Sequence, residues 1–337
     1  MAFDPDTLSP NDFAAAAAAA IAASAHGDLS HAARRLADDG LLGILAIEEI
    51  GGLGLPESFA MPVLSAAGAA RSTFPLLETI FAARLLQGRL PDAATALVAG
   101  EALVSVAWSG EGSVGSDDDG VRLDGVVGRA SHADKAAFIL LATDDGGAAV
   151  VSTGSAGVDI RPASGIDPDR PAFELHLADV RVSTENIVSA EEWQAFRLAC
   201  LQGWAALILG ASEACLAMAE EHANTRRQFG KALSANQALR HILARQKLVL
   251  ENMRAALASC FEAPSSSLQM RSRAAFLAAV EGGVFIIEKS IQIHGGMGFT
   301  WDMPLHRYLR WVRDIQAQAD ADHVLLDLAD DFIAQVA

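Results

Sequence analysis

The segment Arg226-Arg227-Gln228-Phe229-Gly230-Lys231 combines cationic side chains with a glycine that breaks a helix. It follows a long helical stretch, so the arginines could simply offset the negative end of that helix dipole. The alternative is an anion site, because a guanidinium fork suits a diphosphate. Two nearby side chains leave similar choices open. Phe229 either covers a ligand or fills the core, and Gln237, which begins the next helix, either faces the same ligand or is solvated.

The second segment with chemical potential runs from Ile291 to Trp301 and reads Ile-Gln-Ile-His-Gly-Gly-Met-Gly-Phe-Thr-Trp. Gly295 and Gly296 fall in a chain reversal after a helix, where backbone amides can approach a diphosphate closely. A plain helix C-cap requires a single glycine, whereas this segment has a third, Gly298, and then an aromatic residue. The pattern therefore predicts the second half of an anion site, with Gln292 just before it.

Both segments, in this order on helical stretches, resemble those of the acyl-CoA dehydrogenases, a family of flavoenzymes. The resemblance implies FAD as cofactor, an acyl-CoA as substrate, and an FAD that is bound mainly by the neighbouring subunit. It also implies which residues of this chain hold the ADP half of that FAD: Arg226, Phe229, Gln237, Gln292, Gly295 and Gly296.

The residues after the glycines resemble a narrower branch of the same family. The run Thr300-Trp301-Asp302, followed by Leu305-His306, is similar to the branch that acts on CoA esters of sterol and bile-acid side chains. Asp302 is expected to cap the helix that follows. Arg307, Arg310 and Arg313 form a stripe on that helix, and they either make salt bridges at a subunit interface or are solvated.

The reaction of this family needs a carboxylate that removes the α-proton of the acyl-CoA. Family members place this base at one of two positions, which are Cys200 and Ala319 in this sequence. A thiol is a poor base for this step unless its pKa is perturbed. Asp320 and Asp314 lie near the second position, but an aspartate one residue away on a helix points more than a quarter of a turn away. The catalytic residues are therefore left unassigned.

The middle of the chain departs from the family as well. The Trp-Ile-Thr segment that covers the flavin is missing, because Gly125 to His132 leads directly into the next strand. Two other segments match the family's usual Thr-Glu-Pro and Gly-Ser-Asp elements only in part. They are Trp108-Ser109-Gly110-Glu111 and Gly115-Ser116-Asp117. The sequence thus keeps the segments for the ADP half and lacks those for the isoalloxazine ring, which makes sense if it pairs with a different, complete chain.

The elements that must position these residues change in type along the sequence. The expected fold class is α+β of acyl-CoA dehydrogenase type, with a helical domain at 1–101, a small β domain at 102–189 and a four-helix bundle at 190–337. The predicted helices include Leu29–Leu45, 60–89, Glu191–Thr225, Asn236–Phe261, Leu268–His294 and Met303–Val312, with a last segment after Asp314. The predicted strands are Leu103–Ala107, Val121–Leu123, Ala137–Ala142, Ala148–Val151, Phe173–Leu177 and Val180–Val182. Turns are expected at 117–120 and 144–147, and a polar loop at Pro264–Ser267.

Composition narrows the class of protein. The chain has 337 residues, of which 51% are apolar, so it is globular and large enough for two or three units. Its net charge of −17 argues against a nucleic-acid partner. The apolar run Phe13 to Ala25 is too short to span a bilayer and is expected to form a surface helix. The three cysteines lack metal-ligand spacing, so buried thiols, no metal site and a cytoplasmic location are expected.

These features predict the base-lacking subunit of a heteromeric, FAD-dependent acyl-CoA dehydrogenase, whose base comes from a longer homologous subunit. A sterol-derived acyl-CoA is the expected substrate. Two alternatives stay open. One is a self-sufficient homo-oligomeric dehydrogenase with a base relocated to Asp320 or Asp314. The other is a non-catalytic scaffold protein that kept the fold.

Overall fold

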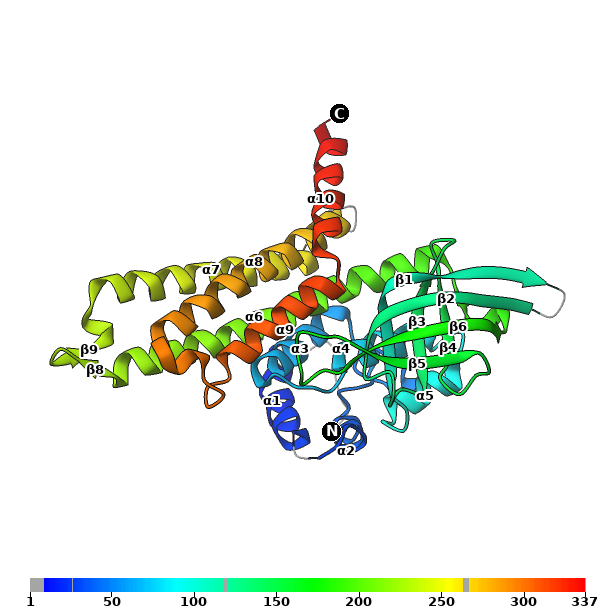
Figure 1. Ribbon diagram of the computed structural model, residues 1–337, viewed down its shortest axis with the longest axis horizontal. Coiled ribbons are helices and arrows are strands. Elements are labelled where there is room, and N and C mark those ends of the chain that lie inside the picture. Colours follow the sequence, from blue (N-terminus) through cyan, green and yellow to red (C-terminus); the bar gives the residue numbers. More distant parts are fainter. Residues whose placement is uncertain (1–8, 26, 118–119, 263–266, 337) are drawn as a thin grey trace. The chain divides into compact units, whose positions relative to one another are not determined.

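The computed structural model describes residues 9–25, 27–117, 120–262 and 267–336 (Figure 1). The tip of the predicted turn at 117–120 and most of the predicted loop Pro264–Ser267 lie outside these residues. The chain divides into two compact units. The first comprises Met1–Val63 and Thr73–Cys200, and the second comprises Leu64–Ser72 and Leu201–Ala337. Element type changes near the predicted domain boundaries, but the division into three domains stays a prediction.

The first unit begins with helices that bury apolar side chains. They are α1 (Asp12–Ser24), α2 (Leu29–Asp38), the start of α3 (Ala60–Ala70), α4 (Leu76–Leu86) and α5 (Pro91–Val98). The predicted helix Leu29–Leu45 was too long. It ends at Asp38 because Gly40 adopts a positive φ of 71° and Leu41 N–H donates to Leu36 O. Leu41, Leu42 and Ile44 are buried as predicted, although they lie outside a helix.

The same unit contains a seven-stranded mixed sheet with the order β5-β6-β2-β1-β3-β4-β7. The strands are β1 (Val104–Asp117), β2 (Gly120–Ser131), β3 (Phe138–Thr143), β4 (Ala148–Ser152), β5 (Val158–Ala163), β6 (Ala172–Val182) and β7 (Ile187–Val188). Among the described strand pairs, β1–β3 alone is parallel, and β1 and β2 form a long hairpin. Leu123, Leu141 and Leu175 are among the residues that form its core.

Two sequence predictions about this sheet needed correction. Phe173–Leu177 and Val180–Val182 belong to one strand, β6, whose register against β2 shifts near Asp179, a residue with a φ of 50°. The edge strand β5 was missed. It is short, its sequence contains Pro162, and all six of its side chains are partly or fully exposed.

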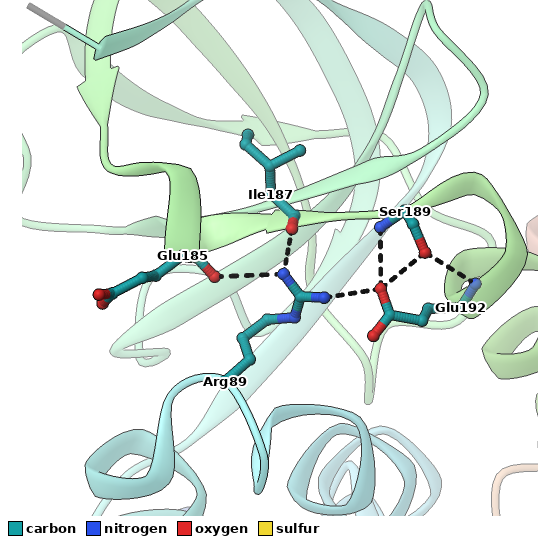
Figure 2. A network of polar contacts seen from close by, with 5 residues as sticks. All are labelled: Arg89, Glu185, Ile187, Ser189 and Glu192. Carbon is teal, nitrogen blue, oxygen red and sulfur yellow. Dashed lines mark hydrogen bonds and ion pairs between the residues drawn. The ribbon is translucent and has the colours of Figure 1, made fainter.

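A polar network fixes the start of α6 (Ala190–Thr225) within the first unit (Figure 2). Ser189 and Glu192 form a capping box. The Ser189 N–H donates to Glu192 Oε2 over 3.0 Å, and the Glu192 N–H donates to Ser189 Oγ over 3.3 Å. Arg89 donates to the carbonyls of Glu185 and Ile187 and pairs with Glu192 at 2.6 Å. The hydrogen bonds from Ser189, and next those from Arg89, lower the pKa of Glu192 to about 2.

The second unit is helical. It contains the rest of α6, α7 (Gln237–Glu262), α8 (Leu268–His294), α9 (Leu305–Gln318) and α10 (Ala321–Val336), with a two-stranded ribbon of β8 (Arg227–Gln228) and β9 (Lys231–Ala232). Figure 1 shows α7 and α8 running along each other. Gln246 Nε2 fixes their register by donating to Ile286 O and Ser290 Oγ.

Glycine allows two helices of this unit to approach closely. A Cβ on Gly210 of α6 would lie 1.8 Å from Ser65 O of α3, and one on Gly68 would lie 2.0 Å from Leu207 O. The predicted last helices were misplaced by a few residues. α9 continues to Gln318, so Asp314 lies inside it, and the chain turns at Asp320, which has a φ of 51°. Asp302 does not cap α9, because Pro304 occupies the N-cap position.

Candidate functional site

The arginine segment forms a tight ribbon directly after α6. The Arg226 N–H donates to His222 O over 2.9 Å, and the Leu233 N–H donates to Arg226 O over 2.9 Å. Phe229 and Gly230 form the turn, with φ values of 51° and 76°, as a type I′ hairpin turn requires. Phe229 is 96% exposed, so the interpretation as a core aromatic was wrong. The Arg226 side chain is exposed too, so both are available to a ligand.

The glycine segment leaves backbone open at the end of α8. Gly295 has a φ of 61°, which favours glycine, and a Cβ on Gly295 or Gly296 would meet nothing within 4 Å. Gly298 has a different role, because a Cβ there would lie 2.6 Å from Ile291 O. Gln292 is exposed, and its Oε1 accepts a hydrogen bond of 3.1 Å from Lys289 Nζ. The space beside Gly295 and Gly296 therefore fits the close approach of a ligand group.

The β8–β9 ribbon and the end of α8 lie at one end of the second unit (Figure 1), and two histidines beside them, His222 and His294, contact each other. The rings of His222 and His294 stack with centroids 4.4 Å apart, and His294 Nδ1 lies 2.8 Å from Ser290 O. Burial chiefly lowers the pKa of His222, and the neighbouring His294 and Arg226 lower it further. A small apolar cluster lies at the same end: Ala219, Ala223, Ile293, Leu233, Leu239, Ile242 and Leu243.

The histidines are the functional candidates that the sequence analysis missed. His222 precedes Arg226 by one helical turn, and His294 directly precedes Gly295. Their positions beside both motifs are a signal that could have been used, but the stacking itself depends on tertiary structure. Gln237 is exposed at the first position of α7, close in sequence to Leu239 of the apolar cluster.

An aromatic and cationic cluster follows the glycine segment. Trp301 is 64% exposed, and the guanidinium carbons of Arg307 and Arg310 lie 5.6 and 5.2 Å from the centroid of its ring. His306 meets the same ring edge-on, with centroids 4.7 Å apart. Arg313 instead pairs with Glu288 at 3.6 Å. The arginine stripe is thus divided between a Trp301 cluster and an ion pair within this unit.

The first unit contains an open pocket of about 250 Å³, separate from the predicted cofactor residues. Phe81, Leu85 and Phe196 supply its apolar lining, and Arg84 pairs with Glu57 at 2.7 Å beside them. Within the described ranges, no group of three or more His, Cys, Asp or Glu residues could hold a metal ion.

Among the described residues, α6 alone is long and apolar enough to cross a membrane, by length and composition only. Of its most apolar 18-residue stretch, 83% is buried inside the protein, as in a core helix.

Comparisons with known proteins now identify the family. The model of the acyl-CoA dehydrogenase C-terminal domain matches residues 202–322. The chain is 30% identical over 273 residues to acyl-CoA dehydrogenase IpdE2 of Mycobacterium tuberculosis, an alignment that covers 80% of this chain and 76% of that protein. The chain belongs to the acyl-CoA dehydrogenase family. Both the predicted family and the predicted α+β fold class are confirmed.

Two solved structures show the same fold. The ChsE4–ChsE5 complex of Mycobacterium tuberculosis matches with a TM-score of 0.87 at 22% identity, covering 98% of this chain and 99% of that one. A variant of the steroid acyl-CoA dehydrogenase Tcur3481–Tcur3483 also has a TM-score of 0.87, at 24% identity, covering 97% and 98%. The family consists of FAD-dependent oxidoreductases that act on acyl-CoA thioesters, so this chain has the fold and ancestry of an oxidoreductase.

Neither of the two residues expected at the family's base positions is suited to proton abstraction here. Cys200 is fully buried, and burial raises the pKa of its thiol well above the usual value, with a further contribution from Glu78. Ala319 is buried and has no titratable group. Asp320 is exposed at the turn between α9 and α10, and Asp314 accepts a hydrogen bond of 2.7 Å from Gln318 Nε2.

Proposed function

We propose that this chain is the base-lacking subunit of a heteromeric, FAD-dependent acyl-CoA dehydrogenase. The observation that carries the proposal is that the chain has an exposed arginine and glycine site but has no base at Cys200 or Ala319. Such a chain can contribute to a cofactor site without performing the reaction alone. The base, and the pocket for the reacting end of the flavin, would then come from a longer homologous subunit.

The cofactor-binding residues of this proposal are those expected from the sequence. Arg226 would pair with the diphosphate of FAD, and the open backbone at Gly295 and Gly296 would approach the same group. Phe229 would cover the adenine side, and Gln237 and Gln292 would line the site. When bound, FAD supplies the acceptor for the hydride that leaves the β-carbon of the acyl-CoA.

A steroid side-chain CoA ester is the substrate class that we propose. The support is the Thr-Trp-acid sequence followed by Leu305-His306, together with the steroid dehydrogenase among the structures of the same fold. The ChsE4–ChsE5 structure, which has the same fold, is a complex of two differently named chains, and this supports a heteromer. The three buried free thiols suit a reducing compartment such as the cytoplasm.

The test is flavin retention in the complex of this chain with its longer subunit. A charge-assisted contact to a diphosphate contributes about 1.5–3 kcal/mol, so Arg226→Ala should weaken FAD binding roughly tenfold to a hundredfold. Gly296→Val should have the same effect, because its side chain would fill the open space beside the backbone. Arg313→Ala, on α9 and outside both segments, should leave the flavin bound.

Flavin content after gel filtration of the intact complex decides between the outcomes. If Arg226→Ala and Gly296→Val both keep full FAD, this chain does not hold the cofactor, and the scaffold interpretation replaces the proposal. If the purified chain alone is yellow and oxidises acyl-CoA, it is self-sufficient, and the relocated base at Asp314 or Asp320 must be tested next.

A further inference from the structure

A continuous part of this acidic chain has only positive charge. Residues 222–250, named the basic segment here, contain six lysine or arginine residues and no aspartate or glutamate, although the net charge of the chain is −17. The segment comprises the end of α6, the β8–β9 ribbon and the first half of α7. All six cationic side chains are exposed: Arg226, Arg227, Lys231, Arg240, Arg245 and Lys247. The proposed cofactor site uses only Arg226.

Most of these cations have no counterion among the described residues. Lys247 pairs with Glu251 at 2.8 Å, and Arg245 lies over the ring of Phe285 at 5.1 Å. In the part of the chain that the structure describes, the side chains of Arg227, Lys231 and Arg240 make no ion pair or hydrogen bond. Like charges held close together repel each other, so this surface has an excess of positive charge that the described part of the chain does not neutralise.

Cations elsewhere in the second unit show the usual arrangement. Arg254 pairs with Glu213 and with Glu251, and Arg273 pairs with Asp327 at 2.9 Å and with Asp331 at 2.5 Å. Acidic residues are abundant enough in this chain to supply such partners. The lack of them from 222 to 250 is therefore a local property of this surface, and an external anionic partner would complete it.

Large apolar side chains are exposed within the same segment. Phe229 lies at the tip of the ribbon between Arg227 and Lys231, and Leu248 of α7 is 61% exposed. Arg240 and Lys247 lie two helical turns apart, on the same side of α7. Arginines and exposed aromatic or aliphatic side chains together are typical of protein interfaces rather than of sites for small anions.

We propose that the basic segment is an electrostatic docking surface for an acidic face of the longer subunit. The inference rests on the proposed function, because Arg226 belongs to the segment and the subunit that holds the FAD must reach this surface. The five other cations exceed what the cofactor contact uses, and a protein face rich in Asp and Glu neutralises them. A nucleic acid is disfavoured, since the net charge of the whole chain repels it.

Docking of this kind acts mainly on the rate of association. Opposite charges steer two subunits together before contact, and salt weakens the effect because the screening length is about 8 Å at physiological ionic strength. Assembly should therefore slow as salt increases. Replacing cations of the basic segment by acids should reverse that dependence, since both surfaces would then repel each other.

The test uses Lys231→Glu with Arg240→Glu, which lie outside the proposed cofactor residues. The matched control is Lys135→Glu with Arg161→Glu in the first unit, which makes the same change in charge. Both control residues are exposed, but they pair locally with Asp134 at 3.4 Å and Asp159 at 2.7 Å. The probe is the longer acyl-CoA dehydrogenase subunit, with association followed by surface binding at about 50 and about 200 mM NaCl.

We expect the Lys231→Glu and Arg240→Glu variant to bind the longer subunit at least about tenfold more weakly at low salt, mostly through slower association. The control should bind like the unmodified chain. Circular dichroism checks the fold, and if the variant is misfolded, Lys231→Gln with Arg240→Gln serves instead and should give an intermediate loss.

Equal affinities for both variants at both salt concentrations would overturn the inference. Tighter binding of a short DNA duplex than of the longer subunit would also overturn it, as would self-association as the only assembly. The inference and the proposed function fail differently. If the docking inference is wrong, the complex forms and its affinity does not change on charge reversal. If the proposed function is wrong, the complex either does not form or retains its flavin without Arg226.

Discussion

Cys200 shows how far a single residue constrains the chemistry. The resemblance to the family places it at one of the two expected base positions, and its thiol is fully buried in α6. Burial raises its pKa, so the thiolate that could accept a proton is not populated near neutral pH. Arg197 opposes this shift but is a smaller influence than burial. Cys200 is therefore expected to fill space rather than to react.

Cys200→Ala should leave the dehydrogenase activity of the assembled complex within a few-fold of the unmodified value. The reason is that a buried neutral thiol takes no part in proton transfer. Steady-state kinetics with an acyl-CoA substrate checks this. A fall of about 10³ or more, the scale expected when a proton-transfer group is lost, would show instead that Cys200 participates.

The sequence predicted the local backbone of the candidate residues better than it predicted their surroundings. The turn at Phe229-Gly230 and the open glycines at Gly295 and Gly296 were readable because backbone freedom is encoded locally. The exposure of Phe229 was not predictable from the sequence, since an aromatic side chain is equally suited to a core. The stacking of His222 on His294 needs two helices to meet, and no local pattern reports that.

Among the elements, α6 depends on a polar arrangement at its first turn. Glu192 accepts hydrogen bonds from Ser189 N–H at 3.0 Å, from Ser189 Oγ at 2.7 Å and from Arg89 at 2.6 Å. The Glu192 carboxylate is also favoured by the positive end of the α6 dipole. Ionised Glu192 thus joins the loop that carries Arg89 to the start of the longest helix.

Glu192→Gln should reduce the dependence of stability on acid pH. The pKa of Glu192 is about 2 in the folded protein, against an ordinary value of 4.5, so its contribution is complete above pH 4.5. It is lost as the pH falls from 4.5 towards 2, because the unfolded chain then binds the proton more readily. The side chain is 44% exposed, so solvent screening keeps the effect to about 1 kcal/mol or less.

Thermal unfolding of the assembled protein at neutral pH and at about pH 3 measures the effect. Glutamine keeps the neutral part of the capping box, so the variant should lose stability at neutral pH and little at acid pH. Parallel pH profiles for both proteins would show that Glu192 is not ionised differently in the folded state. Glu191→Gln, at the exposed neighbouring position on the same turn, is the control.

The type of an element was predictable where its apolar periodicity was strong, whereas some element boundaries were not predictable. The helices at α6, α7 and α8 were found almost to the residue, because each is long and apolar on at least one face. The end of α2 and the turn at Asp320 were missed. Apolar spacing continues past both points, and the break depends on residues with positive φ at Gly40 and Asp320.

At the scale of the whole molecule, exposed large apolar side chains form two groups among the described residues, apart from scattered ones such as Val126 and Leu248. Phe229, Met297, Phe299 and Trp301 lie in or next to the two cofactor segments, and Leu325, Leu326, Phe332 and Ile333 lie on α10. Exposed apolar clusters of this kind mark contact surfaces in proteins that work as assemblies. The order of helices, strands and helices was predictable from composition, apolar spacing and turn residues, but these surfaces required the structure.

The chain expressed alone should be colourless or poorly soluble. It supplies only one part of the proposed cofactor site, and its apolar surfaces lack a partner. Flavin absorbance and gel filtration of the purified chain check this, with the co-expressed complex as the positive control. A soluble yellow protein with one FAD per chain would contradict the expectation and would favour a self-sufficient enzyme.

The buried cysteines give the molecule three built-in reporters of its own opening. Cys200 and Cys215 lie in α6, Cys260 lies in α7, and burial raises the pKa of each thiol. An alkylating reagent attacks the thiolate, so each site is labelled only when its helix separates from its neighbours. Labelling rates compared by mass spectrometry, with and without the longer subunit, would show which helix assembly holds closed and by how much.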